Sequence, residues 1–332
     1  MFIKQFQKKK LMKLLTSKWI TKPIFAASEI GLFEIISKKP KSIGEIAKAT
    51  KTKPQLLYRL LRALASFGFI KETCDQKYKS NNLSKILEQQ DMQAMIAMFQ
   101  SEWHDNAWNC LTQALRTGAN AFELGNGVAD FEYFKKNPKA AHQFSRANFI
   151  KTQEITKIVN SFDFSNYETV TDIGGGYNSL ILHILQSNSH LRCTIVDLDY
   201  LKKEANRSIT NNNLQDRCEF IAGNFFENIP VKSDVFILCN ILHDWDDNRS
   251  KQILDNCQQA MDTSSRLLII EMVVPQGKQQ SVATLMDLEV LVMGNGKERT
   301  HSEFQSLLEK TGLGICEMQK FKKYHLIECN KI

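Results

Sequence analysis

The sequence predicts an α/β protein with a doubly wound, mostly parallel sheet, preceded by an N-terminal helical domain of winged-helix type. From residue 167 onward, short apolar runs alternate with amphipathic helical stretches, which is the pattern of parallel strands joined by crossover helices. The first hundred residues instead suggest short helices followed by one hairpin. We therefore expect domains at residues 1–100 and 157–332. The segment 101–156 between them is expected to be a helical linker that contributes to a substrate pocket.

Composition excludes several classes of protein. The chain has 332 residues, of which 43% are hydrophobic and 24% charged, the balance of an ordinary globular protein. Six prolines and 15 glycines argue against collagen-like and low-complexity disordered chains. No stretch approaches the roughly 18 consecutive apolar residues of a membrane span, so no membrane association is predicted. Eight cysteines stand singly, without zinc-ligand spacing, and indicate reduced thiols of a cytoplasmic protein with no metal site.

The N-terminal hundred residues carry most of the positive charge. They hold 19 basic and 7 acidic residues, which leaves 24 basic and 29 acidic residues for the rest of the chain. Such a basic domain could bind nucleic acid. However, Lys far outnumbers Arg there, and Arg dominates the reading of base edges, so a solvated lysine-rich surface is the favoured interpretation.

The element order of this domain is helix, short helix, longer helix and hairpin. The longer helix has a wide apolar leucine stripe, and the short one opens with Ser42 and Glu45 in capping-box spacing. The predicted helices cover residues 24–36, 43–49 and 54–64, and the predicted strands cover residues 67–70 and 77–79.

The middle segment is rich in aromatic residues, including Trp103, Trp108, Phe131 and Phe144. At helical spacing most of these are expected to be core that joins the two domains, with two or three lining a pocket for an apolar or planar ligand. The C-terminal domain then contains strands at residues 168–173, 192–196, 219–222, 235–238, 266–273, 315–318 and 324–329. Helices are expected at residues 179–186, 200–211, 251–261 and 302–311.

A glycine-rich turn follows the first of these strands. Gly174 and Gly176 stand where the strand gives way to a helix, which lets the backbone approach a bound cofactor closely. Asp197 ends the next strand, 21 residues beyond Gly176, and its two oxygens suit the vicinal hydroxyls of a ribose. These two features indicate an adenosine-type ligand and fit NAD and S-adenosylmethionine equally.

Four further stretches carry a family resemblance. They are Gly223–Glu227, the His-Asp-Trp segment Ile241–Asp247, Ile270–Pro275 and Gly296–Thr300. In this order and spacing, the chain resembles the S-adenosylmethionine-dependent small-molecule O-methyltransferases, which include caffeate, acetylserotonin and bacterial carotenoid or polyketide enzymes. The likeness covers nearly the whole chain. It implies a Rossmann-like catalytic domain, a winged-helix front that forms a homodimer, and methyl transfer to a hydroxyl of a small aromatic or polyketide-like molecule.

The resemblance also implies roles for particular residues. His243 would be the general base, flanked by Glu271 and Glu298. Gly174 and Gly176 would face the methionine part of S-adenosyl-L-methionine, Asp197 the ribose, Leu198 one face of the adenine, and Asn224 with Phe225 the adenine amino group. Phe144, Asn148 and Asp244 would contact the substrate, although Asp244 could equally cap the following helix.

The sequence departs from the family pattern at several positions. Asn224 replaces the usual Asp, Cys239 and Asn240 replace common basic residues, Asn148 replaces a Met, and Asn178 replaces a third glycine. Two alternatives therefore stay open. One is an enzyme on the same scaffold that binds S-adenosylmethionine without transferring methyl. The other is a DNA-binding regulator with residues 54–64 as recognition helix, which offers only Arg59 and Arg62 as base readers.

Overall fold

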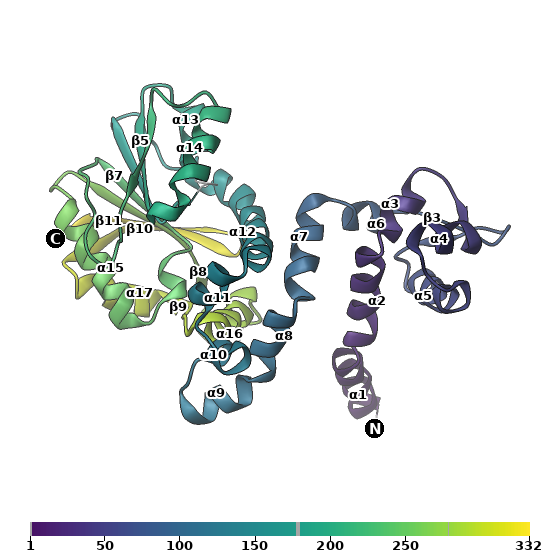
Figure 1. Cartoon of the computed structure of the whole chain (residues 1–332). Helices are drawn as coiled ribbons and strands as arrows, with labels where there is room; N and C mark the ends of the chain where they lie inside the picture. Colours follow the sequence, from purple (N-terminus) through teal and green to yellow (C-terminus); the bar gives the residue numbers. More distant parts are fainter. Residues whose placement is uncertain (1, 177–179, 278) are drawn as a thin grey trace. The chain divides into compact units, whose positions relative to one another are not determined.

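A computed structural model describes residues 2–176, 180–277 and 279–332, and the chain divides into two compact units (Figure 1). The first unit runs to Asp105 and also takes in Asn137–Ala147. The second unit comprises Asn106–Lys136 and Asn148–Ile332. One hydrophobic cluster forms the core of the first unit, and two clusters form the core of the second.

The first unit consists of short helices and a small antiparallel sheet, in the predicted winged-helix order. Three leucines of the predicted stripe, Leu57, Leu61 and Leu64, are buried in its core. The capping box at Ser42 and Glu45 is present. The helices are α1 (Phe2–Leu15), α2 (Lys18–Glu29), α3 (Leu32–Ser37), α4 (Ile43–Thr50), α5 (Pro54–Ser66), α6 (Asn82–Leu87) and α7 (Gln90–Phe99). The strands are β1 (Lys41–Ser42), β2 (Lys71–Glu72) and β3 (Lys77–Lys79), in the order β1-β3-β2.

Two local predictions in this unit are wrong, and a glycine explains each error. The single helix predicted over residues 24–36 is divided into α2 and α3 because Gly31 adopts a left-handed conformation with φ 68°. The residues 67–70, predicted as a strand, instead form the turn that follows the end of α5. There Gly68 has φ 78°, and the amide of Phe69 donates to the carbonyl of Leu64 at 2.9 Å. The hairpin strand therefore begins only at β2.

Five helices connect the N-terminal elements to the large sheet: α8 (Glu102–Asn109), α9 (Leu111–Thr117), α10 (Ala121–Asn126), α11 (Asp130–Lys136) and α12 (Pro138–Val159). This agrees with the helical character predicted for the segment. The ring of Phe122 is fully buried, with the rings of Tyr133 and Phe134 at 5.5 and 5.8 Å between centroids. Trp103 and Phe122 are buried, whereas Phe131 is 52% exposed, so the prediction of core holds for only some of these aromatic residues.

The second unit is built on the predicted doubly wound sheet. Its strands are β4 (Thr169–Ile173), β5 (Arg192–Asp197), β6 (Cys218–Ala222), β7 (Val235–Cys239), β8 (Arg266–Val274), β9 (Arg299–Thr300), β10 (Leu313–Phe321) and β11 (Tyr324–Lys331). The order is β10-β11-β8-β7-β4-β5-β6, with β9 paired to β8. Strands β4 to β8 pair in parallel, whereas β11 pairs antiparallel with both β8 and β10.

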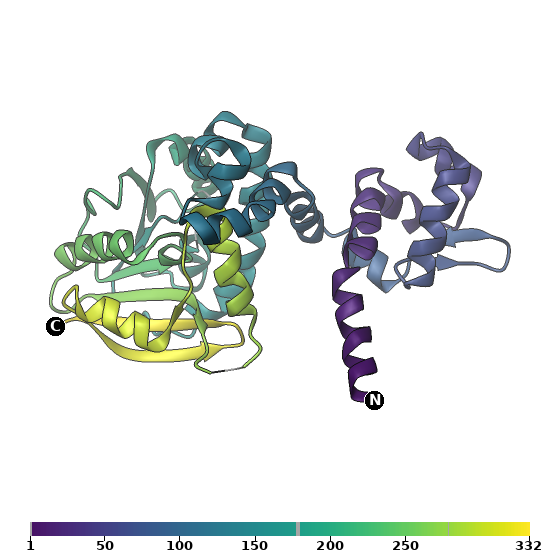
Figure 2. The same cartoon turned by 90° about the horizontal axis from the view of Figure 1, so that it is seen from below.

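Helices cover both faces of this sheet (Figures 1 and 2). Helices α13 (Ile181–Ser187), α14 (Lys202–Asn211) and α16 (Val282–Gly294) contribute to one core cluster, and α15 (Asp247–Ala260) and α17 (His301–Glu309) to the other. The predicted start of the first of these helices, at residue 179, lies outside the described residues. Within the described part of the chain, every helix is too short or too polar to cross a bilayer.

Candidate active site

The predicted cofactor residues and His243 lie at the carboxyl ends of four neighbouring strands. Strands β6, β5, β4 and β7 lie side by side in this order. From β4 the chain adds β5 and β6 on one side, and it then adds β7 on the other side of β4, so the strand order reverses between β4 and β7. Ligands of doubly wound sheets bind in the crevice at such a switch point. The glycine turn leaves β4 and the histidine loop leaves β7, so the two lie on opposite sides of this point.

The glycine turn is bonded to the next strand. The amide of Gly174 donates to the carbonyl of Val196 at 2.8 Å. Gly174 and Gly176 have φ of 74° and 61°, a region that other residues avoid. A Cβ on Gly174 would lie 2.5 Å from Cδ1 of Ile241, whereas a Cβ on Gly176 would meet open space. The turn therefore approaches the histidine loop closely at one glycine and leaves room beside the other.

Asp197 joins the glycine turn to the end of β5. Its carboxylate accepts from the amide of Gly176 at 2.8 Å and from that of Leu198 at 2.7 Å. Burial raises the pKa of Asp197 while these two amides lower it, and the net direction is upward. Both carboxylate oxygens keep a free lone-pair direction for a further donor. Leu198 next to it is 40% exposed, so an apolar side chain borders the carboxylate.

Asn224 and Phe225 follow the third strand. The Asn224 side chain accepts from the amide of Phe226 at 3.1 Å and donates to Glu227 at 3.0 Å. It thereby closes a local turn with its own side chain. Phe225 is partly buried, and its ring lies 3.5 Å from where a Cβ on Gly174 would be. These two residues thus border the glycine turn from the β6 side.

His243 lies in a one-turn helix after β7, η2 (Leu242–Asp244), and is 7% exposed. Its Nδ1 is 2.9 Å from Oε1 of Glu298 and 3.7 Å from Oε2 of Glu271. Its Nε2 is 3.4 Å from Oδ1 of Asp244. Because a carboxylate only accepts, the proton of a neutral imidazole lies on Nδ1, which leaves Nε2 as the basic atom.

The surrounding carboxylates make this imidazole unusually basic. Burial alone lowers the pKa of His243, but Glu271, Asp244 and Glu298 outweigh it and raise the pKa to about 9. Burial raises the pKa of Glu271 to about 7, with His243 acting against that rise. A base of this strength is closer to a phenolic hydroxyl, with its ordinary pKa of about 10, than an unperturbed imidazole.

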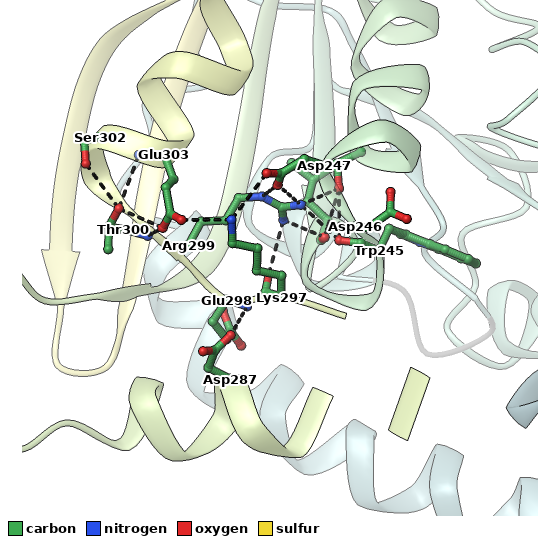
Figure 3. Close-up of polar contacts among 12 residues, drawn as sticks. Trp245, Asp246, Asp247, Asp287, Lys297, Glu298, Arg299, Thr300, Ser302 and Glu303 are labelled. Atoms are coloured by element: carbon green, nitrogen blue, oxygen red, sulfur yellow. Dashed lines mark hydrogen bonds and ion pairs between the residues drawn. The ribbon is translucent and has the colours of Figure 1, made fainter. Parts of the chain in front are cut away.

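The carboxylates also fix the histidine loop. Oε1 of Glu271 accepts from the amides of Ile241, Leu242 and His243 at 3.0, 2.9 and 3.4 Å. The amide of Glu298 donates to Asp287 of α16 at 3.0 Å (Figure 3). Among the described residues, neither Oε2 of Glu271 nor Oε2 of Glu298 has a hydrogen-bond partner, and both atoms are buried. Buried carboxylate oxygens left unbonded are costly and are frequently found at functional sites.

The sequence predictions missed three residues next to this loop. A Cβ on Gly296 would overlap the carbonyl oxygen of His243, and the guanidinium of Arg299 is completely buried behind the loop. Asp130 begins α11, where burial raises its pKa to about 6, and the neighbouring Phe131 stacks on Trp245 at 5.6 Å. Gly296 and Arg299 lie within a stretch that the resemblance had singled out, whereas no signal marked Asp130.

The predicted substrate residues are placed less completely. Asp244 lies beside Nε2 of His243, and the cap of α15 is Asp246, whose side chain accepts from the amide of Arg249 at 2.8 Å. Phe144 belongs to the first unit, where its ring lies 6.4 Å from that of Trp103. The side chain of Asn148 and all of Asn178 lie outside the described residues.

The residues fit the predicted cofactor. The turn at Gly174 and Gly176, the buried acceptor Asp197 and the exposed Leu198 offer space, hydrogen-bond acceptors and an apolar platform in the order that an adenosyl group requires. The ligand-type atoms of His243, Glu271 and Glu298 lie within 4.8 Å of one another, a spacing that a metal ion could also use. Since Nδ1 is hydrogen-bonded to Glu298 and Oε1 of Glu271 to three amides, we interpret the trio as a hydrogen-bonded group.

Fold and site together define a doubly wound α/β enzyme of the Rossmann-like class. The chain belongs to the O-methyltransferase family: its O-methyltransferase domain matches at residues 108–314 and its O-methyltransferase dimerisation domain at residues 12–90. This confirms the predicted fold class, the O-methyltransferase assignment and the cofactor S-adenosyl-L-methionine.

Individual relatives agree with this assignment. The chain is 36% identical over 308 residues to the mitomycin biosynthesis 6-O-methyltransferase of Streptomyces lavendulae, covering 91% of this chain and 88% of the relative. It is 34% identical to a phenazine O-methyltransferase of Lysobacter antibioticus, covering 92% and 90%. Among solved structures, the mitomycin 7-O-methyltransferase MmcR matches with a TM-score of 0.93 and 32% identity over 99% of both chains.

Proposed function

We propose that this protein transfers the methyl group of S-adenosyl-L-methionine to a hydroxyl of a small aromatic or polyketide-like molecule, with His243 as general base. The observation that carries the proposal is the imidazole of His243, buried among three carboxylates and directed by Glu298 so that Nε2 is basic. It stands one strand away from the glycine turn. Relatives named for phenazine and mitomycin chemistry support an aromatic or fused-ring acceptor.

Each group has a task in this reaction. When bound, the cofactor supplies an electrophilic methyl group and a positive charge, which favours the neutral imidazole. Nε2 of His243 removes the proton of the acceptor hydroxyl as its oxygen attacks, and Glu271 and Glu298 stabilise the imidazolium that forms. Asp244, beside Nε2, orients the hydroxyl. Base catalysis of this kind contributes about 10²–10⁴-fold, and alignment of the reacting atoms contributes the rest.

The proposed cofactor contacts keep the order predicted from the sequence. Gly174 and Gly176 face the methionine part, and the carboxylate of Asp197 accepts from the ribose hydroxyls. Leu198 covers one face of the adenine, and Asn224 and Phe225 lie at its amino group. Phe144 and Asn148 are proposed to line the acceptor pocket.

The division into domains at 1–100, 101–156 and 157–332 stays a prediction alongside the two units, and so does the prediction that the protein is cytoplasmic.

A homodimer through the N-terminal domain is part of this proposal. The dimerisation-domain match supports it, and so do large apolar side chains on α1 and α2 that are open to solvent, among them Phe6, Leu15 and Trp19 at 72, 68 and 78% exposure. On α5, the base readers required by the DNA-binding alternative are limited to the exposed Arg59 and Arg62. We expect sedimentation velocity to show a dimer and gel shifts to show no duplex binding below micromolar concentration.

The decisive experiment uses labelled S-adenosyl-L-methionine with a panel of phenols, polyketides and hydroxylated terpenoids, with products identified by mass. With the best acceptor, His243→Ala is expected to lower methyl transfer about a hundredfold or more while cofactor affinity stays intact. The control is His190→Ala, which removes another histidine whose ring contacts the carbonyl of Phe164, at the opposite edge of the sheet. Equal loss of cofactor binding and turnover in His243→Ala would show that His243 is structural. Binding of the cofactor without any product would favour the non-transferring alternative.

A further inference from the structure

Arg299 has the largest fully buried side chain among the described residues. Arg299 lies on the two-residue strand β9, which pairs with the end of β8. All five of its N–H donors are used. They bond to Oδ1 of Asp247 (2.9 Å), the carbonyls of Leu242 (2.8 Å), Lys297 (3.2 Å) and Trp245 (3.0 Å), and Oγ of Ser250 (2.9 Å). A buried charge with every donor satisfied fixes its partners rigidly.

Two of these carbonyls belong to the residues on either side of His243 and Asp244. Arg299 therefore holds the carbonyl side of the histidine loop, while Glu271 accepts its amides from the other side. The amide of Lys297 adds a bond to the carbonyl of His243 itself at 2.8 Å. The loop is thus bonded from both sides by groups of opposite charge, and it has few ways to shift the imidazole.

A second layer ties this arrangement to the surface (Figure 3). Nζ of Lys297 lies 3.3 Å from Oδ2 of Asp247 and 2.8 Å from Oε1 of Glu303. Burial would raise the pKa of Asp247, but Arg299 and Lys297 outweigh it and lower the pKa. Glu303 in turn caps α17 with Thr300. Arg299 is consequently the centre of a network that begins at the catalytic loop and ends at a helix terminus.

We propose that Arg299 is a positioning residue for methyl transfer: it aligns the imidazole of His243 through the loop carbonyls, and its charge keeps Glu271 ionised beside that imidazole. The charged groups that act on Glu271 are His243, Glu298, Asp244 and Arg299. His325 stands opposite Glu271 in register on β11. Arg299 is the permanent cation of this set, because the histidines can lose their charge.

The electrostatic part of the proposal has a definite sign. Without the charge of Arg299, the buried carboxyl of Glu271 is expected to be protonated at a higher pH, so it supports the imidazolium less. The pKa of His243 then falls from its raised value. Because only the neutral imidazole accepts a proton, kcat/KM of the unchanged enzyme rises with pH, with its midpoint near the raised pKa of about 9, and levels off above it. The rising limb of a charge-removed variant lies at lower pH.

The experiment measures kcat and KM for methyl transfer from pH 6 to 10, and cofactor affinity by calorimetry, for three variants. Arg299→Gln is expected to lower kcat at least about tenfold through misplacement of the base and to move the rising limb down by about one pH unit. Arg299→Lys keeps the charge but loses the five-donor fork, so kcat falls and the limb stays in place. The control, Arg266→Gln, breaks a half-buried pair with Glu328 at the other end of β8 (3.1 Å) and leaves the profile unchanged.

The inference rests on the proposed role of His243, and the two can fail separately. If His243 is not the base, the unchanged enzyme has no rising limb and His243→Ala keeps its activity. If His243 is the base but Arg299 only supports folding, Arg299→Gln follows the profile of Arg266→Gln with a uniformly reduced yield of active protein. Should Arg299→Gln fail to fold, an unchanged kcat in Arg299→Lys overturns the positioning role.

Discussion

Two loops at the same edge of the sheet are constructed in opposite ways. The histidine loop is closed: its imidazole is 7% exposed, its amides bind Glu271, and its carbonyls bind Arg299 and Lys297. The turn after β4 and the end of β5 are more open: a Cβ on Gly176 would meet no described residue within 4 Å, and Leu198 is 40% exposed. The comparison shows that the histidine loop is bonded on both its amide side and its carbonyl side, whereas the proposed cofactor side leaves an apolar side chain exposed.

The largest effect is expected where the closed loop is disturbed. Glu271→Gln keeps the shape of the side chain and an oxygen for the three amides, but it removes the charge next to the imidazole. Methyl transfer should fall about 10²–10³-fold, because the imidazolium formed during attack loses a fully buried counter-charge that lies 3.7 Å from Nδ1. Turnover at saturating cofactor and acceptor measures this.

The matched control for that change is Glu219→Gln on β6, where the carboxylate is exposed and contacts only Thr194 in the described part of the chain. It should keep full turnover. Cofactor affinity should change less than about twofold in both variants. A Glu271→Gln enzyme with turnover like that of Glu219→Gln would mean that the closed loop contributes no electrostatic stabilisation to the reaction.

On the open side the effect should appear in binding instead of turnover. Asp197→Ala removes the buried carboxylate at the end of β5 and should weaken cofactor binding by about 1.5–3 kcal/mol, the contribution of hydrogen bonds to a charged group. Calorimetry measures this loss, and kcat at saturating cofactor should stay near its original value. Asp199→Ala, two residues further on and exposed, is the control and should bind normally. An unchanged affinity in Asp197→Ala excludes the ribose contact.

The open side was also the easier one to predict from sequence. A glycine turn and an acid at the next strand end are local signals, and seven of the eight strands described in the second unit fall where apolar runs predicted them, the exception being the two-residue strand β9. The closed loop depends on contacts between segments far apart in the chain. Arg299 donates to the carbonyl of Leu242, which lies 57 residues earlier in the sequence, and the sequence around Arg299 alone does not indicate that its side chain is buried. The family resemblance predicted Glu271 and Glu298 as neighbours of His243, but it did not predict the contacts of Arg299 and Lys297 that fix the histidine loop.

Helix α16 is a second region whose contacts could not be predicted from the sequence. Its residues are apolar on most sides, including the exposed Leu285 at 67%, so the sequence shows no clear helical period over Val282–Gly294. Only the folded chain reveals that Asp287 of this helix receives the amide of Glu298, and that Glu289 receives the indole N–H of Trp108 at 2.9 Å. The acidic residues Asp287 and Glu289 within this apolar helix were the one sequence feature that could have indicated a helix next to the candidate site.

The smallest effect is expected at Asn224, the position where the sequence departs from its family on the open side. The side-chain oxygen already accepts from the amide of Phe226, and the side-chain nitrogen donates to Glu227. In Asn224→Asp the first contact persists, but the second becomes a repulsion between two carboxylates. A stronger acceptor for an adenine amino group is therefore offset by a less stable turn, and cofactor affinity should change less than about fivefold. The double variant Asn224→Asp with Glu227→Gln removes that repulsion and should bind the cofactor more tightly than the original chain in the same calorimetric titration. If it binds no better, the amide of Asn224 is already as good an acceptor as the acid, and the departure from the family pattern has no cost.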